Sequence, residues 1–413
     1  MVAPEGSPAN EHVSEIDVRE PILVLALADL SVHHGALGIL RSAGRLGVSA
    51  FLAHGGPPTP LERSRYCAGR VRLAPNGSEQ DTLGVLSKFH EEYGRAVLVP
   101  VDDSGAMFVE DHAAELAERF DFPRQPPGLV RSFASKRQMH GLCLEHGIPT
   151  PAAAFPESEQ DVRDHARTAV FPVVAKRIDA SLPCADSAPS VVIAHTPDEL
   201  LRAYSLMESP LSANVLLQEY IPGTPESIWM FNGYFDVHSD CIVAFTGQKI
   251  RQSPPDTGAT TLGACALNPA VDATTRRLMK AVGYRGILDI GYRWDPRDGQ
   301  YKLLDVNPRI GATFRLFVGA DGSDVLRTQY LDLTGQPVPA TSLKQGRRWL
   351  VEPLDLRSSL TYLRRGDVTL REWVRSFHRV EELAWWARDD PLPFLAALVL
   401  LARGYMRKRL PRR

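Results

Sequence analysis

The chain has 413 residues, of which 44% are hydrophobic and 23% are charged. This length and apolar content exclude a wholly disordered chain and suit a globular protein of two or three domains. The formal net charge of −2 provides no general attraction to nucleic acid, so we expect no nucleic-acid partner and any phosphate recognition at local sites.

Cysteine usage and the first residues indicate a reducing compartment. The five cysteines form no C-x-x-C pair and no metal-spaced group with histidine, which argues against a disulfide framework and a zinc site. Residues 1–20 are polar and acidic, without the apolar stretch of a secretory signal. We therefore expect a disordered lead-in over residues 1–20 and a cytoplasmic location.

The next predicted elements alternate between strand and helix. An apolar run at residues 22–28, a helical stretch at 35–47 and a second apolar run at 48–53 follow one another. This order predicts a parallel βαβ arrangement and a Rossmann-like α/β domain over residues 21–125.

Two aspartates follow a further predicted strand of this domain. The apolar residues 96–101 are followed by Asp102 and Asp103. Open α/β sheets bind ligands at the carboxyl ends of their strands, so these carboxylates could face a ligand. Aspartate also caps helices, and the two interpretations stay open.

A second domain is predicted after the Pro-rich residues 122–128, which are typical of a linker. A helix at 135–146 comes first. Strand-like runs follow at 170–176, 190–195, 215–220, 227–234, 242–250, 288–294 and 301–306. Strands that outnumber the intervening helices indicate an α+β domain over residues 126–340.

The end of the chain, residues 341–413, is rich in arginine and predicted to be a helical, basic extension. Its apolar stretch at 394–402 is too short to cross a bilayer. The stretch could dock on the rest of the protein. The alternative is a peripheral anchor on the inner face of a membrane, with the basic end attracted to anionic lipid.

The strongest functional pattern is the strand-like sequence LLDVNPR at residues 303–309. Asp305, Asn307 and Arg309 occupy alternate positions, which places them on one face of a strand. A carboxylate and an amide oxygen side by side suit Mg²⁺, a hard ion that is commonly shared with nucleotide phosphates. Arg309 supplies a fixed cation beside them.

Asp289 belongs to a preceding strand, and the turn at residues 295–299 connects that strand with the one that carries Asp305 and Asn307. A hairpin would bring the three oxygen ligands together. A surface hairpin with solvated acids explains one aspartate easily but explains this convergence poorly.

This segment resembles the end of the ATP-grasp fold, in which a strand carries Glu-x-Asn-x-Arg and an acidic residue on the preceding strand completes the metal shell. Asp305 stands where the family usually has glutamate. The resemblance covers residues 97–320 and, more loosely, 22–100. It implies a pre-ATP-grasp Rossmann-like α/β domain, then an α+β ATP-grasp domain, with ATP and with Mg²⁺ or Mn²⁺ on Asp289, Asp305 and Asn307.

The resemblance also implies a nucleotide site. Lys136 and Lys176 match the family's phosphate-binding lysines. Residues Gln218, Glu219, Tyr220 and Ile221 resemble the hinge strand whose backbone contacts adenine, and Glu226 stands at the position of the ribose-binding acid. The family often has a glycine-rich lid after the second lysine, whereas residues 181–189 contain no glycine.

Lys249 and Arg251 resemble the basic strand that faces the γ-phosphate and the acyl substrate. Two cations at alternate positions of a strand are expected on one face. With Arg309 they are the predicted catalytic residues, because positive charge stabilises phosphoryl transfer and the later tetrahedral intermediate.

The family resemblance implies an ATP-dependent carboxylate-amine ligase. Such an enzyme activates a small-molecule carboxylate as an acyl phosphate and joins it to a small-molecule amine, releasing ADP and phosphate. The alternatives are a carboxylase-like or kinase-like enzyme and a catalytically inactive nucleotide-binding regulatory protein. The sequence identifies neither the substrates nor the oligomeric state.

Overall fold

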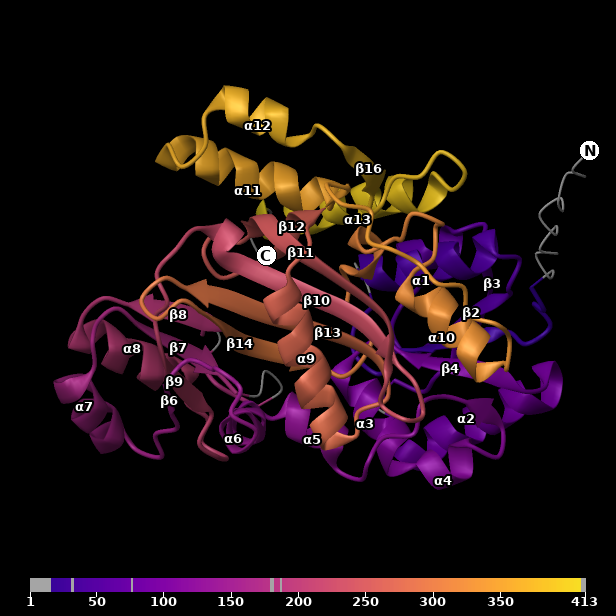
Figure 1. Cartoon of the computed structure of the whole chain (residues 1–413), viewed down its shortest axis with the longest axis horizontal. Helices are drawn as coiled ribbons and strands as arrows, with labels where there is room; N and C mark the ends of the chain where they lie inside the picture. The colour runs from indigo at the N-terminus through magenta and orange to yellow at the C-terminus, as the bar shows by residue number, and fades with distance from the viewer. Residues whose placement is uncertain (1–15, 31–32, 76, 179–181, 186–187, 410–413) are drawn as a thin grey trace, which may run out of the picture.

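The N-terminal part of the chain forms a five-stranded parallel sheet in the order β3-β2-β1-β4-β5 (Figure 1). This computed structural model describes residues 16–409 apart from 31–32, 76, 179–181 and 186–187. The strands are β1 (Ile22–Leu25), β2 (Ala50–His54), β3 (Cys67–Arg72), β4 (Ala96–Pro100) and β5 (Phe120–Asp121). The helices of this part are α1 (His34–Arg45), η1 (Pro60–Arg63), α2 (Glu79–Tyr93), α3 (Asp103–Asp111) and α4 (Ala113–Leu116). The predicted succession of strand, helix and parallel strand is confirmed.

The apolar runs of β1 and β4 have a packing reason. All four residues of β1 are buried, and so are the first four of β4, because helices cover both faces of a parallel sheet. The helix α1 is buried over most of its length, because it also contacts α10 (Val325–Leu333) from the later part of the chain.

Two further sheets follow, both built mainly from antiparallel pairs. The smaller sheet has the order β6-β9-β7-β8, and the larger one has the order β14-β13-β10-β11-β12-β15-β16. The smaller sheet contains β6 (Ala153–Ala154), β7 (Val173–Arg177), β8 (Val191–Ala194) and β9 (Val215–Glu219). The larger sheet contains β10 (Ile228–Phe235), β11 (Cys241–Ser253), β12 (Ala259–Cys265), β13 (Gly286–Asp295), β14 (Gln300–Asn307), β15 (Arg348–Leu350) and β16 (Val380–Leu383). The mixture of parallel and antiparallel sheets agrees with the predicted α/β and α+β parts.

Each of these two sheets has its own helices. The smaller sheet packs against α7 (Glu159–Thr168) and α8 (Pro197–Met207) through one apolar cluster. The larger sheet packs against α5 (Leu129–Ala134), α6 (Lys136–Glu145) and α9 (Pro269–Val282) through another. Short 3-10 turns, η2 (Pro225–Ser227) and η3 (Phe314–Leu316), complete this part. The two sheets are therefore separate layers, and a ligand can lie between them.

The predicted hairpin of residues 288–306 is confirmed by β13 and β14. Asp289 lies directly opposite Asn307, and Gly291 lies opposite Asp305. A register shift follows Gly291, because the pairing skips one residue of β14 before it continues. The antiparallel register therefore brings Asp289, Asp305 and Asn307 to one end of the larger sheet.

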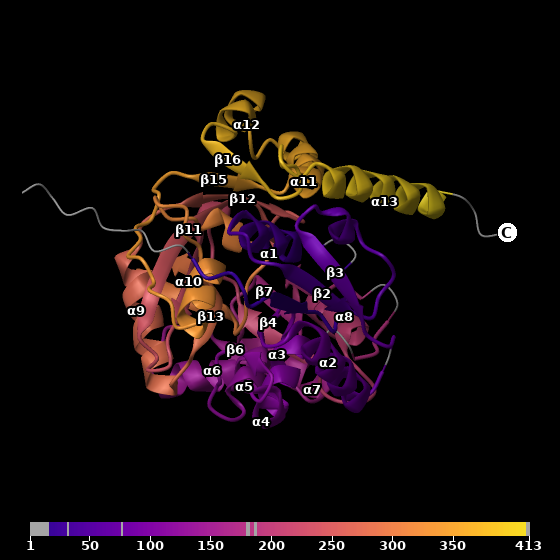
Figure 2. The ribbon, with the colours of Figure 1, turned by 90° about the vertical axis from the view of Figure 1, so that its right-hand side faces the viewer.

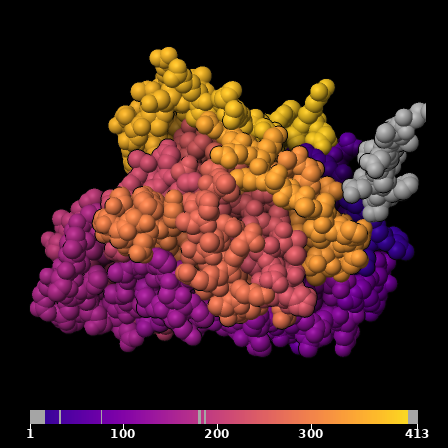
Figure 3. Space-filling model, in the orientation of Figure 1, coloured from indigo at the N-terminus to yellow at the C-terminus, as the bar shows by residue number. Residues whose placement is uncertain are grey.

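The C-terminal residues differ from the helical extension expected from the sequence. They contain α11 (Glu352–Arg365), α12 (Leu370–Ser376) and α13 (Leu392–Arg409), but β15 and β16 also add two strands to the larger sheet. In Figure 3 this segment lies as a yellow layer along the upper side of the molecule. Arg41 and Asp390 form an almost completely buried ion pair, with Nε and Oδ2 3.0 Å apart, which ties this layer to α1. Among the described residues, no helix is both long enough and apolar enough to cross a membrane.

Candidate nucleotide and metal site

A cavity of about 560 Å³ lies between the smaller and the larger sheet. Cavities of this size commonly hold a small molecule or cofactor. Charged and polar side chains from both sheets and from α6 line it. The lining residues predicted from the sequence are Lys136, Lys176, Gln218, Glu219, Tyr220, Ile221, Lys249, Asp289, Asp305, Asn307 and Arg309. The fold thus brings most of the predicted site residues to one place.

Oxygen atoms gather at the end of the cavity formed by β13 and β14. Burial raises the pKa of Asp289 to about 6, although nearby Arg309 acts in the opposite direction. The described residues contain no group of three or more His, Cys, Asp or Glu side chains that could hold a metal ion. A cation here would need the amide oxygen of Asn307 and ligand phosphates beside Asp289 and Asp305, and Mg²⁺ accepts such a mixed oxygen shell.

Two lysines from different elements reach the same region. The Nζ atom of Lys136 contacts the carboxylate of Asp305, and Lys176 donates a hydrogen bond of 2.7 Å to Oε1 of Gln218. Burial and repulsion from Lys136 together lower the pKa of Lys176 to about 8. Crowded, partly desolvated cations of this kind favour a polyanionic ligand such as a nucleotide polyphosphate.

The hinge residues lie along one wall of the cavity. The strand β9 lies between β6 and β7, so its backbone is already paired as far as Glu219. The carboxylate of Glu219 accepts hydrogen bonds from Lys302 at 3.0 Å and from Arg297 at 2.7 Å. Among the hinge residues, therefore, Tyr220 and Ile221 offer backbone atoms outside this ladder.

The structure does not bring Glu226 to the cavity. Its side chain is exposed on η2 and is not among the lining residues. Its backbone carbonyl accepts a hydrogen bond of 2.9 Å from Nε2 of Gln248. Its position therefore gives no support to a ribose-binding role.

The expectation that Lys249 and Arg251 share a face is wrong. The pairing of β11 with β12 shifts register between the two residues, because Lys249 lies opposite Gly263 while Arg251 lies opposite Leu262. This bulge breaks the period of two. Lys249 lines the cavity, where burial lowers its pKa to about 8.

Arg251 instead forms a buried ion pair outside the cavity. Its Nη2 atom lies 2.8 Å from Oδ2 of Asp355 on α11, and both side chains are 2% exposed. Thr261 donates a hydrogen bond to the same carboxylate. This position removes Arg251 from the catalytic set and makes it a link between the larger sheet and the C-terminal layer.

Two functional candidates were missed in the sequence. Arg293 lines the cavity from β13, two alternate positions beyond Asp289, so the same period-two argument would have found it. Its guanidinium lies 5.9 Å from the centre of the Tyr220 ring. Arg177, next to Lys176, also lines the cavity.

The aspartates after β4 have different roles. Asp102 caps α3 by accepting from the backbone N–H of Gly105 at 2.7 Å, as one interpretation expected. Asp103 accepts a hydrogen bond of 2.7 Å from Nε of Arg309. This second contact joins the N-terminal sheet to the predicted catalytic arginine, and no sequence pattern indicated it.

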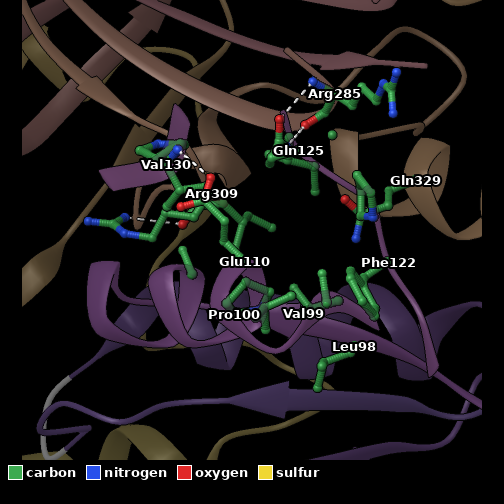
Figure 4. A pocket seen from close by; sticks show the side chains of 18 of the residues that line it. Leu98, Val99, Pro100, Glu110, Phe122, Gln125, Val130, Arg285, Arg309 and Gln329 are labelled. Atoms are coloured by element: carbon green, nitrogen blue, oxygen red, sulfur yellow. Dashed lines mark hydrogen bonds between the residues drawn. The ribbon is translucent and has the colours of Figure 1, made fainter. Parts of the chain in front are cut away.

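A smaller pocket lies on the other side of Arg309, between the N-terminal sheet and the β13–β14 hairpin (Figure 4). Its volume is about 50 Å³, which is enough for a few water molecules and too small for a nucleotide. Gln125 donates to the backbone carbonyl of Arg285, and Glu110 accepts from the backbone N–H of Val130 at 2.9 Å. This pocket belongs to the contact between the two parts of the chain.

No family model matches the chain. A curated relative, the D-aspartate ligase of Enterococcus faecium, is 22% identical over 331 residues, covering 76% of this chain and 77% of that protein.

Several solved structures have the same fold. The L-amino acid ligase of Bacillus licheniformis has a TM-score of 0.58 and 14% identity, with 77% of this chain and 75% of that chain covered. The N5-carboxyaminoimidazole synthetase of Staphylococcus aureus, complexed with ADP, has a TM-score of 0.61 and 11% identity over 81% and 82%. Biotin carboxylase of Campylobacter jejuni has a TM-score of 0.58 and 15% identity over 80% and 74%. These relatives belong to the ATP-grasp superfamily of carboxylate-amine ligases, and the chain shares their fold.

Proposed function

We propose that the protein is an ATP-dependent ligase that activates a carboxylate as an acyl phosphate and transfers the acyl group to an amine. The observation that carries this proposal is the convergence of hard oxygen ligands and cations in one cavity. The oxygen ligands are Asp289, Asp305 and Asn307, and the cations are Lys136, Lys176, Lys249, Arg293 and Arg309. A polyphosphate bound with a divalent cation satisfies both groups at once, because its oxygens complete the metal shell and pair with the cations.

ATP would lie along the cavity with its adenine beside Gln218 to Ile221. The backbone of Tyr220 and Ile221 would contact the base edge, since the preceding residues of β9 are already paired. Lys136 and Lys176 would hold the phosphates. Mg²⁺ or Mn²⁺, held by Asp289, Asp305 and Asn307, would supply neutralisation of the phosphate charge.

Ligation then requires two transfers at the end of the cavity near Arg309. In the first, a carboxylate oxygen attacks the γ-phosphorus and the bond to ADP breaks. In the second, the amine nitrogen attacks the acyl carbon, phosphate leaves, and the nitrogen gives up a proton to water or phosphate. Lys249 and Arg309 would stabilise the negative charge that develops in both steps.

The proposed substrates are amino acids or compounds that carry an amino-acid group. The names of two relatives, a D-aspartate ligase and an L-amino acid ligase, support this class. We further propose the division into residues 1–20, a Rossmann-like domain at 21–125, an ATP-grasp domain at 126–340 and a C-terminal extension at 341–413. The pairing of β12 with β15 means that the extension would complete the larger sheet.

The test is ADP release from the full chain with pairs of amino acids, dipeptides and simple amines. Ligation predicts ADP and an amide product in equal amounts, and both should disappear in Asp305→Ala. Bicarbonate with a single amine tests the carboxylase alternative, in which a carbamate forms. A kinase-like enzyme would release ADP with a stable phosphorylated product. Tight ATP binding without any turnover would favour the inactive regulatory alternative.

A further inference from the structure

The helix α13 leaves an apolar surface exposed. Its first turns dock, because Phe394 packs on the core and against Trp386, and Ala397 is buried. Beyond this point it projects away from the body of the molecule (Figure 2). Large apolar residues here are about half exposed, with Leu398 at 42% and Val399 at 52%.

The exposed residues surround the helix instead of forming one face. Leu398, Val399, Leu400 and Leu401 are consecutive and all exposed. Because successive helical residues point about 100° apart, four of them cover the whole circumference. A helix that is apolar on every side is normally buried in protein or lipid, and the described residues leave this one uncovered.

The charge of the chain after Asp390 indicates which kind of surface covers the exposed part of α13. After Asp390 the sequence contains no acidic residue, and it contains six cations, Arg403, Arg407, Lys408, Arg409, Arg412 and Arg413. The whole chain has a net charge of −2, so this end is opposite in sign to the rest. An anionic surface complements it, whereas a second copy meeting it symmetrically would bring two basic ends together.

We propose that α13 is a peripheral membrane anchor whose partner is a bilayer containing anionic phospholipid. The apolar residues 392–402 span roughly 16 Å as a helix, about half of the hydrocarbon thickness. This segment therefore lies within the headgroup boundary and does not cross the bilayer. The exposed Trp386 beside Phe394 has the amphipathic ring that is enriched at that boundary.

Co-sedimentation of the full chain with lipid vesicles tests the anchor. We expect binding to vesicles of phosphatidylcholine mixed with phosphatidylglycerol, and weak binding to phosphatidylcholine alone. High salt should reduce the binding, because screening shortens electrostatic attraction. Absence of binding to the mixed vesicles, or equal binding to both compositions, would overturn the proposal.

Two double variants separate the apolar and basic contributions. Leu395→Ser with Val399→Ser, and Arg407→Glu with Arg409→Glu, should each weaken vesicle binding by roughly tenfold or more. The matched control is Leu211→Ser with Val237→Ser, which changes exposed apolar residues elsewhere and should leave binding unchanged.

Unchanged binding in either α13 variant overturns the anchor, as does an equal loss in the control. Thermal melts of all variants show whether each one is folded. Sedimentation velocity without lipid tests whether a second copy of the chain binds this surface instead. Self-association that is lost in the Leu395→Ser, Val399→Ser variant would assign the surface to that second copy. The outcome is independent of the proposed ligase activity, because no readout uses turnover.

Discussion

Asp305 and Asn307 are the residues at which the proposed metal site can be tested most directly. Alanine at either position removes one oxygen ligand, and we expect ADP release to fall by roughly a hundredfold or more. The fold should survive, because the Asp305 side chain is 41% exposed and both residues face the cavity. ADP release and a thermal melt measure the two effects. Asp298→Ala, in the turn of the same hairpin, is the control, and near-normal turnover of Asp305→Ala would remove the metal assignment.

Lys176 gives the site a pH dependence. Its pKa of about 8 in the free protein lies below the ordinary value, so the ammonium form that pairs with phosphate is lost as the pH rises through about 8. ATP affinity should therefore be highest below pH 8 and should decrease above it, and Lys249, with a pKa also of about 8, acts in the same direction. Calorimetric titration of ATP across this range measures the effect.

Replacement of Lys176 by methionine separates its ligand role from its effect on stability. A charge-assisted hydrogen bond contributes about 1.5–3 kcal/mol, so Lys176→Met should weaken ATP binding by roughly ten- to a hundredfold. The unfolded chain holds the Lys176 proton up to a higher pH than the folded one, so the charged form destabilises the folded protein below pH 8. The melting temperature without ATP should therefore stay the same or rise. A clear fall in melting temperature with unchanged ATP affinity would make this lysine structural.

At the scale of elements, the bulge of β11 lies against α11. The buried pair of Arg251 and Asp355 lies directly beside the register shift that separates Arg251 from Lys249. Asp355→Ala leaves a buried guanidinium without its partner and should lower the free energy of unfolding by about 3–5 kcal/mol. Arg251→Met combined with Asp355→Leu should recover most of that loss. Denaturant titration measures the free energy of unfolding of the single and the double variant. Equal values would show that Arg251 and Asp355 are not coupled.

At the scale of the whole molecule, the contact of Asp103 with Arg309 joins the N-terminal part of the chain to the proposed reaction centre. Asp103 and Arg309 come from different parts of the fold, and the Asp103 side chain is 47% exposed. Such a pair contributes at most about 1 kcal/mol to stability, so Asp103→Ala should melt nearly as the parent does. Because Arg309 would lose the group that orients it, kcat should fall roughly ten- to a hundredfold while the KM for ATP stays unchanged.

Steady-state kinetics with ATP varied provide this measurement. Asp111→Ala is a matched control on the same helix, since Asp111 pairs with Arg131 and not with the cavity. A rise in the KM for ATP with unchanged kcat would place Asp103 in nucleotide binding instead of orientation of Arg309. An unchanged kcat and KM would leave the contact without a role in turnover.

The sequence by itself determined the features that depend on local periodicity. The period of two along LLDVNPR and the turn before it were enough to predict the hairpin and the meeting of Asp289, Asp305 and Asn307, because an antiparallel register follows from a short connection. The apolar runs of β1 and β4 were equally informative, since strands buried on both faces have no other pattern. Metal binding and the ATP contacts of these residues stay predictions.

Only the tertiary structure decided the features that depend on distant partners. The same period of two failed at Lys249 and Arg251, because a bulge shifts the register between them and Arg251 pairs with Asp355 of α11, about a hundred residues later in the chain. The partners of Arg309 and of β12, which are Asp103 and β15, also come from distant segments. A local pattern specifies which face of a strand a side chain occupies, but burial, ion pairing and sheet addition are determined by whichever segments the folded chain brings alongside.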